Sequence, residues 1–191
     1  MDGKIRVGLI YGSTRQGRFC DKVAGWAAEQ IAGNEKFLLD IIDPAATSPD
    51  GEAHLEGNHG AASLRQLIGQ AEAFVVVTPE YNHGYPAPLK SLIDSFGAEW
   101  QAKPVAFVSY GGVSGGLRAV EQLRLVFAEL HTVTIRDAVS FAGAWEQFDD
   151  AGKLLEPERP CRSMATMLAR LHWWAVALQN ARDSVPYTTA A

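Results

Sequence analysis

Short apolar runs alternate with helical stripes along most of the chain. Five of the runs are rich in β-branched or aromatic residues, as in IRVGLI and AFVVVT. Such nearly continuous apolar runs are typical of parallel strands that are covered on both faces of a sheet. The predicted strands are residues 5–10, 37–42, 73–78, 104–109 and 133–135, with an extension of the last one to residue 141 left open.

Between these strands, apolar positions recur every three or four residues, which predicts amphipathic helices. In the first helix, over residues 19–31, the stripe ends at Gly33-Asn34 and consists of Phe19, Val23, Trp26, Ala27 and Ile31. The other predicted helices cover residues 61–70, 89–96, 117–130 and 161–182.

The alternation of strand and helix predicts an α/β fold, with a parallel sheet, right-handed crossovers and helices on both faces. Five strands favour the order 2-1-3-4-5 over a six-stranded Rossmann sheet. The chain has 191 residues and shows no internal repeat or linker, so residues 1–191 should form one domain. In this order strands one, three and four are neighbours, and a ligand crevice opens at their carboxyl edge, where the winding reverses.

Composition narrows the class of protein. The net charge of −5 argues against general nucleic-acid binding, which requires a basic face. We expect no membrane association, because no stretch approaches the roughly 18 apolar residues of a membrane helix. Cys20 and Cys161 are far apart in the sequence, and two free thiols in a reducing cytoplasm are the expected state.

The loop after the first strand, within LIYGSTRQGR, has the composition of a phosphate site. A helix follows it, and a helix N-terminus offers free backbone N–H groups and a positive dipole end. Hydroxyls, guanidinium groups and close backbone approach come from Gly12, Ser13, Thr14, Arg15, Gly17 and Arg18. The alternative is an ordinary helix start followed by solvated arginines. Neither GxGxxG nor GxxxxGK[ST] is present, which favours a terminal monophosphate over a dinucleotide or triphosphate.

The loops after strands three and four should border the same crevice. TPEYNHGYPAP carries Tyr81, His83 and Tyr85, whose rings could stack on a flat ligand. His83 is either an acid/base group or a solvated bystander, whereas Lys90 and Asp94 on the next helix should form an i,i+4 ion pair. SYGGVSGG is glycine-rich, which suits either a wall against a flat ring or a flexible hinge.

The loop after strand two is acidic and raises the question of a metal site. Its candidate ligands are Asp50, Glu52, His54, Glu56 and His59. The intervening Gly, Pro and Asn residues instead favour an acidic loop at the border of an acceptor pocket, and no metal ligand is assigned.

Three segments together resemble the NADPH-dependent FMN reductase family of flavodoxin-like proteins, which includes quinone, azo-dye and chromate reductases. They are GSTRQGR, TPEYNHGYPAPLKSLID and SYGGVSGGLRA, and the resemblance covers residues 4–141. It implies that the first loop binds the FMN phosphate while the other two enclose the isoalloxazine ring and the ribityl chain. The implied cofactor-binding residues are Ser13, Arg15, Gly17, Arg18, Pro79, Glu80, Tyr81, Asn82, Ser109, Tyr110, Gly111 and Gly112. Many family members have small polar residues where this chain has Arg18 and Cys20.

The resemblance also implies an activity. Hydride from NADPH or NADH would pass to FMN and then to a quinone-like, azo or metal-oxyanion acceptor by ping-pong kinetics, with no protein acid or base required. The alternatives are a flavin reductase that supplies free reduced FMN to a monooxygenase, a flavodoxin-type electron carrier and a flavin-binding sensor.

The resemblance implies a homodimer or homotetramer, because relatives are typically dimers or tetramers. The last predicted helix carries residues that could form a subunit contact. Met164, Leu168 and Leu171 should be buried on this helix. Trp173 and Trp174 are adjacent and point to different faces, so one of them should be exposed and available for a subunit contact.

Overall fold

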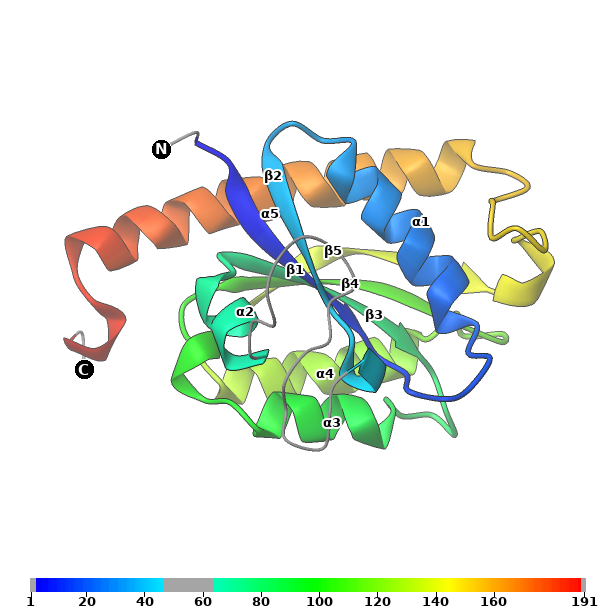
Figure 1. Cartoon of the computed structure of the whole chain (residues 1–191), viewed down its shortest axis with the longest axis horizontal. Helices are drawn as coiled ribbons and strands as arrows, with labels where there is room; N and C mark the ends of the chain where they lie inside the picture. The colour runs from blue at the N-terminus through cyan, green and yellow to red at the C-terminus, as the bar shows by residue number, and fades with distance from the viewer. Residues whose placement is uncertain (1–2, 47–63, 190–191) are drawn as a thin grey trace.

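In the computed structural model, which describes residues 3–46 and 64–189, one five-stranded parallel sheet forms the centre of the molecule (Figure 1). Its strands are β1 (Ile5–Tyr11), β2 (Phe37–Ile42), β3 (Ala73–Pro79), β4 (Pro104–Gly111) and β5 (Val133–Ala142). Their order is β2-β1-β3-β4-β5, which confirms the predicted α/β topology. The central strands β3 and β4 are buried at every position, as expected for strands with helices on both faces.

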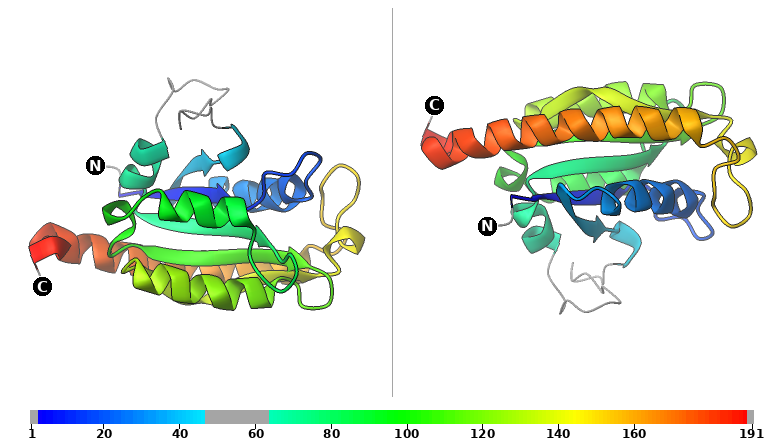
Figure 2. Two further views of the ribbon diagram at one scale, coloured as in Figure 1. Left: turned by 90° about the horizontal axis from the view of Figure 1, so that it is seen from below. Right: turned by 90° about the horizontal axis from the view of Figure 1, so that it is seen from above.

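The helices divide between the two faces of the sheet (Figure 2). They are α1 (Cys20–Ala32), α2 (Leu64–Gln70), α3 (Ala87–Asp94), α4 (Leu117–Glu129) and α5 (Glu158–Ser184), with short 3-10 turns η1 (Pro44–Ala46), η2 (Ala98–Trp100), η3 (Ala144–Glu146) and η4 (Tyr187–Thr189). Helices α1 and α5 pack over one apolar cluster, and α2, α3 and α4 pack over the other. Alternate residues of β3 serve the two clusters, with Val75 and Val77 on one side and Phe74 and Val76 on the other.

The fifth strand reaches Ala142, so the longer of its two predicted extents is correct. The last helix begins at Glu158, earlier than the predicted residue 161. Pro160 is tolerated in its first turn because the missing N–H breaks no intrahelical bond there. Lys90 and Asp94 form the predicted ion pair, at 2.6 Å. Cys20 and Cys161 are free thiols, and no helix among the described residues is long and apolar enough to cross a membrane.

The expectation of an exposed tryptophan on α5 is confirmed, but it understates the exposure. Met164, Leu168 and Leu171 are buried as predicted, but both tryptophans that follow them are exposed, at 63% for Trp173 and 37% for Trp174. The apolar stripe of α5 rests on the sheet, and His172 packs edge-on against Phe37, so both indoles fall outside the covered face. The five candidate metal ligands of the acidic loop lie outside the described residues.

Candidate functional site

Three loops meet at the carboxyl edge of the sheet, as the strand order predicts. We call them the arginine loop (residues 12–19), the PEYN loop (residues 79–86) and the glycine loop (residues 111–116). Backbone bonds join them at their roots: Gly12 N–H donates to the Val77 carbonyl at 2.8 Å, and Glu80 N–H donates to the Tyr110 carbonyl at 3.1 Å. The loops therefore start from fixed neighbouring positions on β1, β3 and β4.

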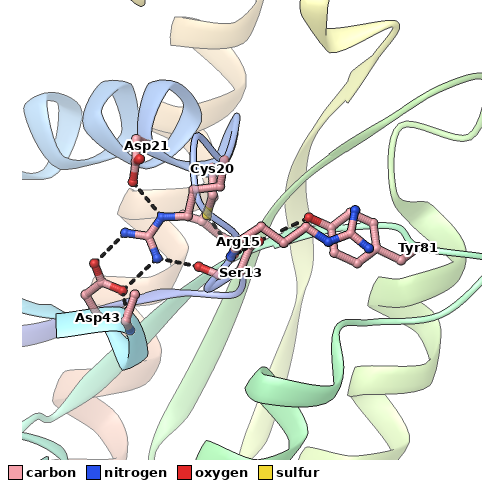
Figure 3. Close-up of polar contacts among 9 residues, drawn as sticks. Ser13, Arg15, Cys20, Asp21, Asp43 and Tyr81 are labelled. Atoms are coloured by element: carbon pink, nitrogen blue, oxygen red, sulfur yellow. Dashed lines mark hydrogen bonds and ion pairs between the residues drawn. The ribbon is translucent and has the colours of Figure 1, made fainter. Parts of the chain in front are cut away.

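A tight turn in the PEYN loop aims Tyr81 at the arginine loop (Figure 3). Tyr81 and Gly84 exchange two backbone hydrogen bonds, at 2.9 and 3.0 Å, and Asn82 and His83 between them have φ values of 52° and 68°. Two successive positive φ values are the mark of a type I′ turn, in which Asn is tolerated well. The Tyr81 hydroxyl lies 3.1 Å from Ser13 Oγ, so the turn joins the two loops.

The two arginines of the arginine loop have different partners. Arg18 is 9% exposed and donates to Asp21, to Asp43 and to the Ser13 carbonyl. Its hydrogen bonds to Asp43 raise the pKa of its guanidinium above the ordinary value. Arg15 is exposed, stacks 3.7 Å above the centre of the Tyr81 ring, and has no carboxylate partner among the described residues. Arg15 is therefore the cation of this loop that is available to an anionic ligand.

Backbone donors surround Arg15. Thr14, Gln16 and Gly17 make no hydrogen bond to any described part of the chain, and Gly17 has a φ of 62° that places its backbone in the left-handed region. Helix α1 follows without a side-chain cap at Phe19, so the positive end of its dipole is directed towards this loop, while the Asp21 and Lys22 N–H groups donate to the Arg18 and Phe19 carbonyls. A guanidinium, unbonded amides and an uncapped helix start together suit a phosphate group.

Glu80 ties the PEYN loop to the start of α4. Its carboxylate is 7% exposed and accepts hydrogen bonds from Ser114 Oγ at 2.7 Å, Arg118 N–H at 3.1 Å and Arg118 Nη1 at 2.7 Å. Burial alone would raise the pKa of this carboxyl, but the Ser114 and Arg118 bonds outweigh it, so the pKa lies below its ordinary 4.5. The predicted cofactor residue Glu80 therefore has its side chain engaged within the protein.

Replacing Glu80 by glutamine should make the stability less dependent on pH. A carboxyl whose folded pKa is depressed stabilises the fold above its ordinary pKa of 4.5, and this contribution is lost as the pH falls through the folded pKa. At pH 7 we expect Glu80→Gln to lower Tm by roughly 2–4 °C, the equivalent of about one net hydrogen bond. Thermal unfolding from pH 3 to pH 7 measures this, and a Tm difference that persists undiminished at pH 3 would contradict it.

The glycine loop turns back against its own strand. Gly115 and Gly116 have φ values of 60° and 85°, and the Gly115 carbonyl accepts hydrogen bonds from Ser109 Oγ at 2.8 Å and Ser140 Oγ at 2.9 Å. Ser109 is buried, so its side chain supports the loop from within. A Cβ on Gly112 would meet nothing within 4 Å, which leaves this part of the loop open to close approach by a ligand.

Tyr110 points away from the crevice, beneath α1. It is 4% exposed, its ring lies 5.9 Å from that of Phe19, and its hydroxyl, next to the Cys20 thiol, finds no hydrogen-bond partner among the described residues. Burial raises the pKa of both the Tyr110 hydroxyl and the Cys20 thiol, which keeps both groups neutral. At this position only the backbone is presented to a ligand in the crevice.

A further wall of the site lies outside every motif found in the sequence. Gly143 N–H donates to the carbonyls of Gly111 and Gly112, at 2.9 and 3.0 Å, and so fixes η3 against the glycine loop. Trp145 of η3 is 58% exposed and lies edge-on to Phe19, with 6.5 Å between ring centres. Figure 2 shows this segment beside the loop that precedes α1. No sequence signal identified it, because its contacts depend on where β5 ends.

The site was also incompletely predicted at the end of β2. Asp43 follows this strand directly and holds Arg18, but sequence reasoning did not assign it a role. The signal that could have identified it is an acidic residue at the carboxyl end of a strand that neighbours the arginine loop.

FMN fits these residues. Within the part of the chain that the structure describes, one guanidinium without a carboxylate partner and several unbonded amides match the phosphate, and the open backbone at Gly112 leaves room for a flat ring. Of the residues expected to bind it, Arg15, Gly17, Asn82 and Gly112 have groups free to do so. Arg18, Glu80, Ser109 and Tyr110 direct their side chains to the protein instead.

Comparison with known proteins identifies relatives of the chain. A sequence model of the family described as NADPH-dependent FMN reductase matches residues 5–146. The NAD(P)H-dependent FMN reductase C4B3.06c of Schizosaccharomyces pombe is 36% identical over 118 residues, which cover 56% of this chain and 58% of that relative. The NAD(P)H:quinone oxidoreductase of Solanum tuberosum is 32% identical over 177 residues, which cover 86% and 90% of the two chains.

Solved structures show the same fold. The flavoenzyme NAD(P)H:(acceptor) oxidoreductase FerB of Paracoccus denitrificans superposes with a TM-score of 0.66 at 20% identity, over 91% of this chain and 98% of that one. A flavodoxin, WrbA-like protein from Agrobacterium tumefaciens superposes with a TM-score of 0.55 at 14% identity, over 94% and 99%. At these identities the likeness establishes the flavodoxin-like fold.

Proposed function

Because this chain belongs to the NADPH-dependent FMN reductase family, we propose that it is an NAD(P)H-dependent FMN oxidoreductase with a quinone-type small-molecule acceptor. The observation that carries this proposal is the arrangement around Arg15. A guanidinium with no carboxylate partner among the described residues stacks on the Tyr81 ring, near amides that make no hydrogen bond to the described chain, and the glycine loop at the same sheet edge has open backbone at Gly112. Such a site can bind a phosphate at one end and a planar ring at the other.

In this proposal the chain binds and orients the cofactor. Arg15 and the amides of the arginine loop hold the FMN phosphate, the PEYN backbone from Pro79 to Asn82 lies along the ring, and Gly112 allows the ring to approach. When bound, FMN supplies two-electron transfer from reduced nicotinamide to the acceptor. The chain contributes position and a polar environment, and no side chain is assigned as acid or base. The His83 side chain is exposed and makes no hydrogen bond to a described residue, while its carbonyl accepts from Gln122 Nε2 at 2.9 Å, which holds the turn in place.

An anaerobic experiment tests the proposal. NADPH, and separately NADH, is added to the FMN-loaded protein while the visible flavin band is followed, and a quinone is then added. We expect the band to bleach and the quinone to restore it, with ping-pong kinetics under turnover. Failure to bleach with either nucleotide would overturn the reductase and favour a carrier or sensor. Release of reduced FMN into the filtrate would instead support a supplier of free flavin to a monooxygenase.

We also propose that the chain acts in the cytoplasm as a homodimer or homotetramer. The support is an exposed aromatic pair on α5, where the Trp173 and Trp174 rings are 5.1 Å apart and both are accessible. Sedimentation of the full chain measures the oligomeric state. Replacing both tryptophans by serine should shift it to a smaller species, and an unchanged distribution would place the contact elsewhere.

A further inference from the structure

Arg18 links three segments around the proposed phosphate site, and its partners Ser13, Asp21 and Asp43 are labelled in Figure 3. Its Nε donates to Asp21 in the first turn of α1 at 2.7 Å. Its Nη1 donates to Asp43 at 2.8 Å and to the Ser13 carbonyl, and its Nη2 donates to the second oxygen of Asp43. One guanidinium therefore joins the arginine loop, the start of α1 and the end of β2.

We propose that Arg18 is a positioning residue that shapes the arginine loop and does not itself contact the phosphate. With Asp21 and Asp43 it forms what we call the loop clasp. This inference rests on the proposed function, because it assigns roles within the FMN site. It separates two arginines that the sequence places three residues apart in the same loop.

The charge around Arg18 argues against direct phosphate binding. Two carboxylates contact its guanidinium, so the clasp as a whole carries a net negative charge that repels a phosphate. The bidentate pair with Asp43 is also largely buried, at 9% and 17% side-chain exposure. Turning Arg18 towards a ligand would leave the Asp43 carboxylate with no counter-charge, which is unfavourable for a buried ion. Arg15, which is exposed and has no carboxylate partner among the described residues, meets neither obstacle.

The clasp acts on the ligand site through Ser13. The Ser13 carbonyl accepts from Arg18, while Ser13 Oγ lies 3.1 Å from the Tyr81 hydroxyl. The same Tyr81 ring carries the Arg15 guanidinium at 3.7 Å. Fixing the Ser13 carbonyl therefore fixes where Tyr81, Arg15 and the unbonded amides of the loop stand relative to one another. Preorganised donors bind an anion more tightly than mobile ones.

The two possible roles of Arg18 predict opposite effects for Asp43→Asn. If Arg18 positions the loop, Asp43→Asn and Arg18→Gln should each weaken FMN binding by on the order of tenfold, and the double variant should be no worse than either single one. If Arg18 binds the phosphate, Asp43→Asn releases its guanidinium and should leave FMN affinity unchanged or tighter. The measurement is FMN affinity from quenching of flavin fluorescence by the FMN-free protein.

Riboflavin, which lacks the phosphate, separates positioning from general damage to the fold. Substitutions in the loop clasp should lower the ratio of FMN affinity to riboflavin affinity. A merely destabilised protein would instead lose affinity for both ligands. Arg18→Lys, which keeps the charge but not the bidentate geometry, is the conservative variant and should retain part of the ratio. Tighter or unchanged FMN binding in Asp43→Asn, or additive losses in the double variant, would overturn the clasp. Wild-type protein that binds no FMN would overturn the proposed function itself.

Discussion

Replacing Arg15 by alanine is expected to weaken FMN binding by about 1.5–3 kcal/mol, or roughly 10- to 150-fold, the range for hydrogen bonds to a charged group. The effect should be large because Arg15 is the cation of the arginine loop that no described carboxylate contacts. Because Arg15 pairs with no described carboxylate, its replacement leaves no buried acid without a counter-charge, and the fold should stay intact. Surface substitutions of this kind usually change stability by no more than about 0.5 kcal/mol.

The Arg15 experiment has controls in both ligand and protein. Riboflavin affinity should change much less than FMN affinity, because the lost contact is to the phosphate. Arg162→Ala, at a 74% exposed site on α5, should alter neither affinity. FMN affinity equal to wild type in a folded Arg15→Ala protein would remove Arg15 from the site. A rising salt concentration should reduce the difference between wild type and variant, because screening weakens exposed charge interactions.

The fold could be read from the sequence because its determinants are local. The run AFVVVT predicts a strand buried on both faces, and β3 is one. The alternation of such runs with helical stripes leaves few topologies, and right-handed crossovers select among them. Once the strands are parallel and in the order 2-1-3-4-5, the meeting of the loops after β1, β3 and β4 follows from geometry.

The roles of individual side chains in the site could not be predicted in the same way. Arg15 and Arg18 are the same residue type in the same loop, and what distinguishes them is Asp43, which lies 25 positions after Arg18, directly after the neighbouring strand β2. Glu80 is engaged by Ser114 and Arg118, which are 34 and 38 positions away. Tyr110 turns away from the crevice because alternate residues of β4 face opposite sides of the sheet. Motifs identify which loops form a site, and long-range pairing decides which groups in them remain available.

Replacing Gly116 by alanine is expected to lower the free energy of unfolding by about 2–4 kcal/mol, from left-handed backbone strain and overpacking. Gly116 has a φ of 85°, and an added Cβ would lie 2.8 Å from Ser109 Cβ and 2.9 Å from the Tyr110 nitrogen. Those atoms belong to the buried strand β4 and cannot yield without moving the sheet. For a chain of this length the loss corresponds to a fall in Tm of roughly 4–16 °C.

Gly112→Ala is the matched control for Gly116→Ala, because the two positions share a loop but differ in what surrounds them. At Gly112 the new methyl group meets nothing within 4 Å and φ is not positive, so Tm should stay within a degree or two of wild type. If the glycine loop is the wall against which the flavin lies, this methyl group must occupy ligand space and weaken FMN binding while the fold is unchanged. A folded Gly112→Ala protein with wild-type affinity would show that the ring does not approach there, whereas an unaltered Tm in Gly116→Ala would show that the loop can shift. Measuring both variants thus separates the conformation of the loop from its contact with the cofactor.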